Sequence, residues 1–221
     1  MGIALVFSLS RMGVFSLVLT ALFLPTLLRV RDSRQRLATG IGLGLVALMT
    51  AGALWIGLDV VVERYGQLLE ENAIVREGRA VVFRDTIQMI TANPFGVGTG
   101  HYQDRFRQYQ TFHPELLFDH AHNDYLETMA EWGTPVALGF WCFILFVLVS
   151  AVRAFLGPGP PERRGILMAC IGAIFSILVH SLTDFNLQIP SNAMLFFTFV
   201  GIAAAYSFGG SETGPEFFGN N

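Results

Sequence analysis

The sequence predicts an all-α, polytopic helical membrane protein with about five transmembrane helices and one long extracytoplasmic loop. The first observation is composition: 52% of the residues are hydrophobic, mean hydropathy is +0.51, and 14% are charged, where soluble domains carry roughly 25%. A soluble chain of this length could not bury so much apolar surface in one core. The second observation is that the apolar residues fall into separate runs, each near the ~20 residues that a helical span needs.

Five runs are predicted to span the membrane, at 5–28, 38–58, 134–155, 166–186 and 191–208. Backbone amides and carbonyls in lipid must be hydrogen-bonded within the chain, so each run is predicted to be a helix. The first run has no positive n-region and is interrupted by Arg11, so it is not a cleavable signal peptide. Because the chain begins almost inside this run, we expect a fragment, or a mis-assigned start, of a longer membrane protein.

Arginines in two short loops predict the orientation. One group lies between the first two runs and another flanks the loop between the third and fourth: Arg29, Arg31, Arg34 and Arg36, then Arg153, Arg163 and Arg164. By the positive-inside rule both loops are cytoplasmic. The predicted division is two transmembrane helices (1–58), an extracytoplasmic loop with short amphipathic helices (59–132), three transmembrane helices (133–208) and a flexible cytoplasmic tail (209–221).

The first motif in the long loop is a predicted helix followed by closely spaced glycines. Residues 76–91 have the apolar periodicity of an amphipathic helix that carries Arg79 and Arg84, and Asn93-Pro94 is expected to end it. Glycines at 96, 98 and 100 permit positive φ, so their N–H groups either form a nest for an anion or simply make a tight turn. No strand precedes them, so they are not a dinucleotide fingerprint.

Two histidines come next, in His120-Ala121-His122-Asn123, directly before a predicted short helix at 124–132. Glu127 and Glu131 lie on one face of that helix at i, i+4 spacing. A helix N-terminus favours anions, and a histidine there can act as a general base. Two alternatives stay open: solvated, idle histidines, or a metal pair with a nearby aspartate, for which no third ligand occurs at a fixed spacing. We therefore predict no metal.

Three ionisable residues interrupt apolar runs. Arg11 lies in the first run, and His180 and Asp184 are at i, i+4 near the end of the fourth. Such groups usually face a cavity or a partner, although Arg11 could instead snorkel to the headgroups, and His180–Asp184 could be only a structural pair. The predicted topology puts all three on the side of the long loop. Cys142 and Cys170 are expected to be core residues.

Arginines, glycine N–H groups and a helix N-terminus suit a diphosphate head group, and a nearby histidine suits removal of a proton from a hydroxyl. Together they fit group transfer from a lipid diphosphate donor. The cations are all arginine and the net charge is −3, which gives no indication of a nucleic-acid partner. Two other functions stay open: a membrane transporter for a small anion, using the ionisable residues of the spans, or an inactive, truncated protein.

Four segments in order resemble the C-terminal half of the O-antigen ligase and O-antigen polymerase superfamily of bacterial inner membranes. They are Ser10-Arg11, Gly78-Arg79 through to Asn93–Gly100, His120–Glu127 with Glu131 and Gly133, and His180–Pro190. The resemblance spans Ser10 to about Tyr206. Val136 departs from the ligase pattern, so the resemblance does not separate a ligase from a polymerase. Members of the superfamily usually have about twice as many spans.

The resemblance implies a metal-independent, cofactor-free membrane glycosyltransferase with a periplasmic catalytic loop. Such an enzyme moves a glycan from undecaprenyl diphosphate to an acceptor hydroxyl on lipid A–core or on another glycan. It implies that Arg11 and Arg79 hold the diphosphate and that His122 activates the acceptor. The further candidates for binding or orienting the substrate are Arg84, His120, Asn123, Glu127, Gly98, Gly100, His180 and Asp184.

Overall fold

A computed structural model describes residues 11–31, 40, 44, 79–112 and 115–209. Within these ranges the chain is all-helical and contains no strand, as predicted. The elements are α2 (Arg11–Arg31), a helix over residues 79–92, α4 (Tyr102–Phe106), α5 (Asp124–Trp132), α6 (Thr134–Leu156), α7 (Pro161–His180), the 3₁₀ helix η1 (Asn186–Gln188) and α8 (Pro190–Phe208).

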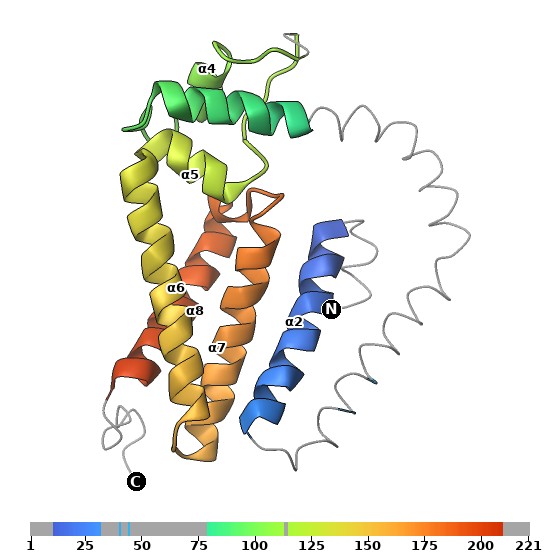
Figure 1. The fold of residues 1–221 in the computed structure, drawn as a ribbon, viewed down its shortest axis with the longest axis vertical. Coiled ribbons are helices and arrows are strands. Elements are labelled where there is room, and N and C mark those ends of the chain that lie inside the picture. Colours follow the sequence, from blue (N-terminus) through green and yellow to red (C-terminus); the bar gives the residue numbers. More distant parts are fainter. Residues whose placement is uncertain (1–10, 32–39, 41–43, 45–78, 113–114, 210–221) are drawn as a thin grey trace, which may run out of the picture.

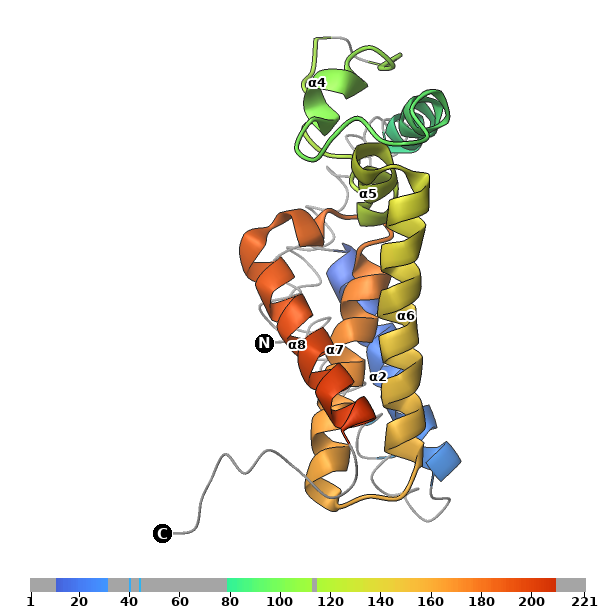
Figure 2. The same ribbon diagram turned by 90° about the vertical axis from the view of Figure 1, so that its left-hand side faces the viewer.

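Four helices, α2, α6, α7 and α8, lie side by side as a bundle, and the 79–92 helix, α4 and α5 lie across one end of it (Figures 1 and 2). The core of the bundle includes small residues, among them Ala151 and Ala203, which let the helices approach closely. Large apolar side chains are exposed on the outer faces of α6 and α8, which suits lipid as their solvent: Leu138, Phe143, Leu145, Phe146, Leu195 and Phe197.

In the described part of the chain, α6, α7 and α8 are long and apolar enough to cross a membrane. The third and fifth predicted spans agree with α6 and α8 to within a residue at each end. In α2 the apolar stretch is Phe15–Leu28, shorter than a full span. The predicted span at 38–58 lies outside the described residues apart from positions 40 and 44. The protein is thus a helical membrane protein.

The fourth span was predicted at 166–186, and its limits were wrong. The helix begins at Pro161, because proline is well suited to a first helical turn even where polar residues follow. It ends at His180, because the chain beyond leaves the helix and the Ser181 hydroxyl and the Leu187 N–H donate to Asp124 of α5. Hydropathy could not reveal that end, since the hairpin from 181 to 189 is itself rich in apolar residues.

A sharp corner joins the bundle to the helices across its end. α5 begins and ends where the sequence predicted. Its N-cap is Asn123, whose Oδ1 accepts the Leu126 N–H at 3.0 Å. Gly133, with φ of 83°, ends α5 and begins α6. A Cβ on Gly133 would lie 2.4 Å from the Phe95 carbonyl carbon, so the 93–98 segment packs directly on this corner.

Candidate functional site

The start of α5 is fixed to the hairpin between α7 and α8 by one buried carboxylate. Asp124 accepts the Ser181 hydroxyl at 2.6 Å and the Leu187 N–H at 3.2 Å, and its own N–H donates to the Ser181 carbonyl at 3.0 Å. Burial raises the pKa of Asp124 to about 6, against the effect of the two donors. Tyr125 adds a bond from its hydroxyl to the Leu178 carbonyl at 2.7 Å. Two segments about 60 residues apart in sequence therefore meet at a defined place.

A second buried carboxylate, Glu127, holds the segment that enters α5. Its side chain is 2% exposed; Oε1 lies 2.7 Å from His120 Nδ1, and Oε2 accepts the Ala121 N–H at 2.9 Å. Burial raises the pKa of Glu127, and the bond with His120 opposes that rise. Asn123, besides capping α5, donates its Nδ2 to the Leu182 carbonyl at 2.7 Å. Residues 120, 121 and 123 are thus all fixed by hydrogen bonds.

His122 lies between these fixed neighbours with an unusual backbone conformation and a buried ring nitrogen. Its φ is +50°, the left-handed region that residues other than glycine rarely adopt. Its Nδ1 is buried and has no hydrogen-bond partner among the described residues. Both histidine rings contact Phe185 of the hairpin: His120 stacks on its face with centroids 4.4 Å apart, and His122 meets it at a steep angle at 5.2 Å. Backbone strain of this kind is held by surrounding contacts and is common at functional sites.

Charges from three segments act on His122. Burial lowers its pKa, and Arg79 of the 79–92 helix lowers it further, while Asp184 and Asp119 raise it and His120 lowers it. His122 is therefore a neutral imidazole at neutral pH, the form that can accept a proton. The structure brings His120, His122, Asn123 and Glu127 together with Arg79 and with the hairpin.

His180 and Asp184 lie in contact in the hairpin. Nε2 of His180 lies 3.3 Å from Oδ2 of Asp184, although Asp184 comes after the end of α7 rather than on it. This contact with His180 holds the pKa of Asp184 below its usual range. Asp184 is thus an ionised carboxylate whose charge reaches His122, which ties the pair to the histidine site.

The glycine turn has the positive φ angles that the sequence allowed, and its N–H groups bond to another part of the protein. Gly96, Gly98 and Gly100 have φ of 87°, 102° and 76°. The Gly98 N–H donates to the Glu131 carbonyl at 2.9 Å, and the Gly100 N–H donates to Glu131 Oε1 at 2.8 Å. The anion bound in this turn is therefore the Glu131 carboxylate of α5. Of the two alternatives left open by the sequence, the geometry favours a turn that anchors the loop.

Glu131→Ala is expected to release this turn. The buried carboxylate also accepts the Tyr102 N–H at 3.3 Å, so its loss leaves two amides without their acceptor. We expect amide hydrogen exchange at Gly100 and Tyr102 to accelerate at least about tenfold, as for loss of about 1–2 kcal/mol of local protection. Glu131→Gln, which keeps one acceptor oxygen, should give a smaller effect, and the exposed Glu162→Ala should give none. Unchanged exchange in Glu131→Ala would contradict this assignment.

Arg84 lies away from the histidines. Its guanidinium bonds to Asp85 at 3.0 Å and to the Thr111 hydroxyl, and its side chain is 57% exposed. It follows Arg79 by five residues, which turns it about 140° around the helix. Arg84 therefore fastens the 79–92 helix to the segment after α4, whereas Arg79 acts on His122.

Arg11 is the first residue of α2, and its side chain lies outside the described residues. The backbone register still gives its level along the bundle. Phe23 stacks on Phe175 of α7 with centroids 4.4 Å apart. Phe23 is twelve residues after Arg11, and Phe175 is only five before His180. Because α2 and α7 run in opposite directions (Figure 1), α2 begins at least as far toward the α5 end as His180 lies.

The sequence analysis missed four contributors to the site. Asp124 fastens α5 to the hairpin, and Phe185 contacts both histidines. Thr183 and Asn186 each bury one side-chain polar atom, Oγ1 and Nδ2, without a partner in the described part of the chain. The sequence feature that could have identified Thr183 and Asn186 is their polar character beside the His180–Asp184 pair, among the apolar residues of the hairpin.

A protein-family model described as O-antigen ligase matches residues 1–141, which is more than half of the chain. The match includes the 79–92 helix, the glycine turn, the two histidines at 120 and 122, and α5. The hairpin lies beyond the match. No curated protein matches the chain.

Proposed function

The chain belongs to the O-antigen ligase family, and from this premise we propose that it transfers a glycan from undecaprenyl diphosphate to an acceptor hydroxyl. The acceptor is lipid A–core in ligation, or another glycan in polymerisation. Family membership makes the chain a membrane enzyme of the O-antigen ligase and polymerase type that acts on lipid-linked polysaccharide. The donor lipid, the acceptor and the mechanism below are part of the proposal.

The observation that carries the proposal is the state of His122. It is neutral at neutral pH, unbonded within the described residues, and fixed on both sides by bonded neighbours. In the proposed reaction the acceptor oxygen forms a bond to the anomeric carbon and passes its proton to His122. The bond from that carbon to the diphosphate oxygen breaks, and its electron pair leaves with the diphosphate. General-base assistance of this kind contributes about 10²–10⁴-fold to rate.

Arg79 and Arg11 are the proposed partners of the leaving diphosphate. A guanidinium can bond two phosphate oxygens at once and stays charged at all physiological pH values. Two of them could stabilise the developing negative charge in the role that a metal ion has elsewhere. Arg79 is exposed at the start of the described part of its helix and acts on His122. The backbone level of α2 is compatible with Arg11 reaching the same place.

The other candidates take positioning roles in this proposal. Glu127, His120 and Asn123 hold His122 in its conformation, and Gly98 and Gly100 let the loop close on α5. Asp184, with His180, would stabilise the imidazolium that forms when His122 takes the proton. Arg84 stabilises the loop.

We further propose that the chain lies in the bacterial inner membrane with its α5 end in the periplasm. The end opposite α5 carries the arginines of the α6–α7 turn, and the positive-inside rule then favours the cytoplasm for that end. In this orientation the 59–132 loop is the periplasmic catalytic loop.

The transfer reaction can be tested in cells that lack their own enzyme of this type. We expect the chain, in the context of its whole protein, to restore long surface glycan, seen as a ladder on a gel. Arg79→Ala should abolish the ladder, since loss of one charge-stabilising group costs about 10²–10³ in rate. The exposed Arg105→Ala removes the same charge from α4 and should leave the ladder intact. A normal ladder with Arg79→Ala would contradict the proposal.

Asp184→Asn is expected to move the pH dependence of transfer in a defined direction. Asp184 raises the pKa of His122, while Arg79 and His120 lower it and Asp119 raises it. Without the Asp184 charge the His122 pKa falls, so protonation inactivates the enzyme only at a lower pH, and the acidic limb of the profile shifts down. The rate at the plateau should also fall, by up to about tenfold for each unit of lost basicity.

The control for this measurement is the exposed Asp104→Asn in α4, which should leave the profile unchanged. An acidic limb that stays in place, or moves to higher pH, in Asp184→Asn would show that Asp184 does not act on the proton acceptor.

A further inference from the structure

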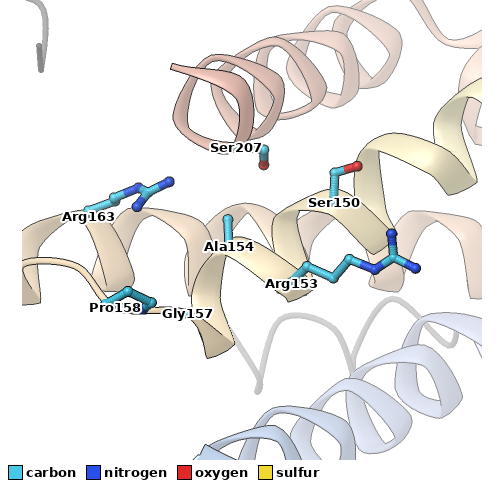
Figure 3. Close-up of a pocket in the computed structure, with 7 residues that line it drawn as sticks. All are labelled: Ser150, Arg153, Ala154, Gly157, Pro158, Arg163 and Ser207. Carbon is cyan, nitrogen blue, oxygen red and sulfur yellow. The ribbon is translucent and has the colours of Figure 1, made fainter. Parts of the chain in front are cut away.

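A cavity of about 420 Å³ lies at the end of the bundle opposite the histidines. It forms where the last turn of α6, the first turn of α7 and the last turn of α8 meet. In Figure 3, Arg163 and Arg153 lie on either side of Ala154, and Ser207 of α8 lies above them. The lining residues are Ser150, Arg153, Ala154, Gly157, Pro158, Arg163 and Ser207. Among the described residues, no acidic side chain lines the cavity.

The arginines at this end have different partners. Arg163 donates Nε and Nη2 to the Tyr206 carbonyl at 3.1 and 2.8 Å, and Arg164 donates to the Gly159 carbonyl. Arg163 thereby offsets the partial negative charge at the C-terminal end of α8. Arg153 is exposed in the last turn of α6 and has no ion-pair or hydrogen-bond partner in the described part of the chain. In the described part of the chain, the cavity thus offers an arginine without an internal partner and a surrounding of net positive charge.

The position of the cavity limits what can fill it. α6, α7 and α8 are the helices long and apolar enough to cross the membrane, and the cavity lies where all three reach one end of their apolar stretch. Lipid headgroups lie at that depth. A basic recess between membrane helices is suited to an anionic headgroup, whose phosphate accepts from arginine and serine donors.

We propose that this cavity binds the phosphate group of an anionic phospholipid headgroup. Arg153 provides the positive charge without an internal partner among the described residues. Arg163 and the Ser150 hydroxyl, which also line the cavity, provide further donors. The small residues Ala154 and Gly157 leave room for the headgroup. A soluble phosphate shares this chemistry, and only the attached acyl chains distinguish the two sources. The proposal does not depend on glycan transfer.

The test is retention of lipid by the purified protein in detergent, measured by native mass spectrometry as phosphatidylglycerol is titrated in. We expect phosphatidylglycerol to be retained and phosphatidylcholine, whose choline ammonium makes the headgroup zwitterionic and net neutral, to be lost. Arg153→Gln should weaken phosphatidylglycerol binding about tenfold, as expected for loss of one charge-assisted contact. Arg107→Gln removes one exposed arginine near α4, at the other end of the protein, and should change nothing.

Ala154→Leu is a second variant that fills the cavity without changing charge, and it should also abolish retention. Inorganic phosphate as competitor separates the two sources: displacement of the lipid only at far higher concentration supports a lipid site, and equal potency supports a soluble phosphate. Retention by Arg153→Gln and Ala154→Leu equal to that of the unaltered protein would overturn the proposal. So would equal retention of phosphatidylcholine.

Discussion

His122→Ala is expected to abolish glycan transfer while the chain stays folded in the membrane. The imidazole makes no hydrogen bond within the described residues, so its removal breaks no internal contact of that kind. Removal also replaces a bulky residue at positive φ by a smaller one. The expected loss is that of a general base, about 10²–10⁴-fold in kcat. The measurement is the rate at which glycan joins the acceptor in membranes that contain equal amounts of each protein.

The matched control is His101→Ala, which removes an exposed histidine next to α4 and the glycine turn. It should retain the unaltered rate. A rate within about threefold of the unaltered protein in His122→Ala would remove this residue from the chemistry. A chain lost from the membrane would instead point to a structural role.

Gly133→Ala is expected to destabilise strongly the corner between α5 and α6. The added Cβ would lie 2.4 Å from the Phe95 carbonyl carbon and 2.7 Å from its oxygen, both backbone atoms that cannot rotate away. The φ of 83° costs a residue other than glycine about 1–3 kcal/mol even without that overlap. We expect the 93–100 segment to separate from α5, and the thermal unfolding midpoint in detergent to fall by several degrees.

Gly139→Ala provides the comparison, because nothing lies within 4 Å of its added Cβ and the residue is inside α6. Alanine has a higher helix propensity than glycine, so this variant should be as stable as the unaltered protein, or more stable by about 1 kcal/mol. Equal unfolding midpoints for the two variants would contradict the close packing at the corner.

Sequence patterns were most informative where the signal is local. The limits of α5 agree with the predicted helix at 124–132, and the glycines at 96, 98 and 100 have the positive φ that they were expected to permit. The spans α6 and α8 follow from hydropathy and length. The end of α7 could not be predicted this way, because Leu182, Phe185 and Leu187 continue the apolar pattern beyond His180. The helix stops where Ser181 bonds Asp124 of a distant segment.

The sequence could not predict how the candidate residues are arranged relative to one another. Glu127 and Glu131 were expected on one face of α5, but each holds a different loop: one the histidine segment, the other the glycine turn. These contacts join segments that only tertiary packing brings together. Spacing in the sequence therefore could not show whether the glycine N–H groups bind a ligand or the Glu131 side chain. Likewise, Arg79 and Arg84 look alike in sequence, and only their positions around the helix separate their roles.

The central claim is tested most directly by the products of one reaction in liposomes that contain the protein, an undecaprenyl-diphosphate-linked glycan and an acceptor. The proposed function predicts that free undecaprenyl diphosphate and joined glycan appear in equal amounts, that a metal chelator leaves the rate unchanged, and that His122→Ala abolishes both products together. Joined glycan that forms equally well with His122→Ala, or donor that is consumed without release of undecaprenyl diphosphate, would contradict it.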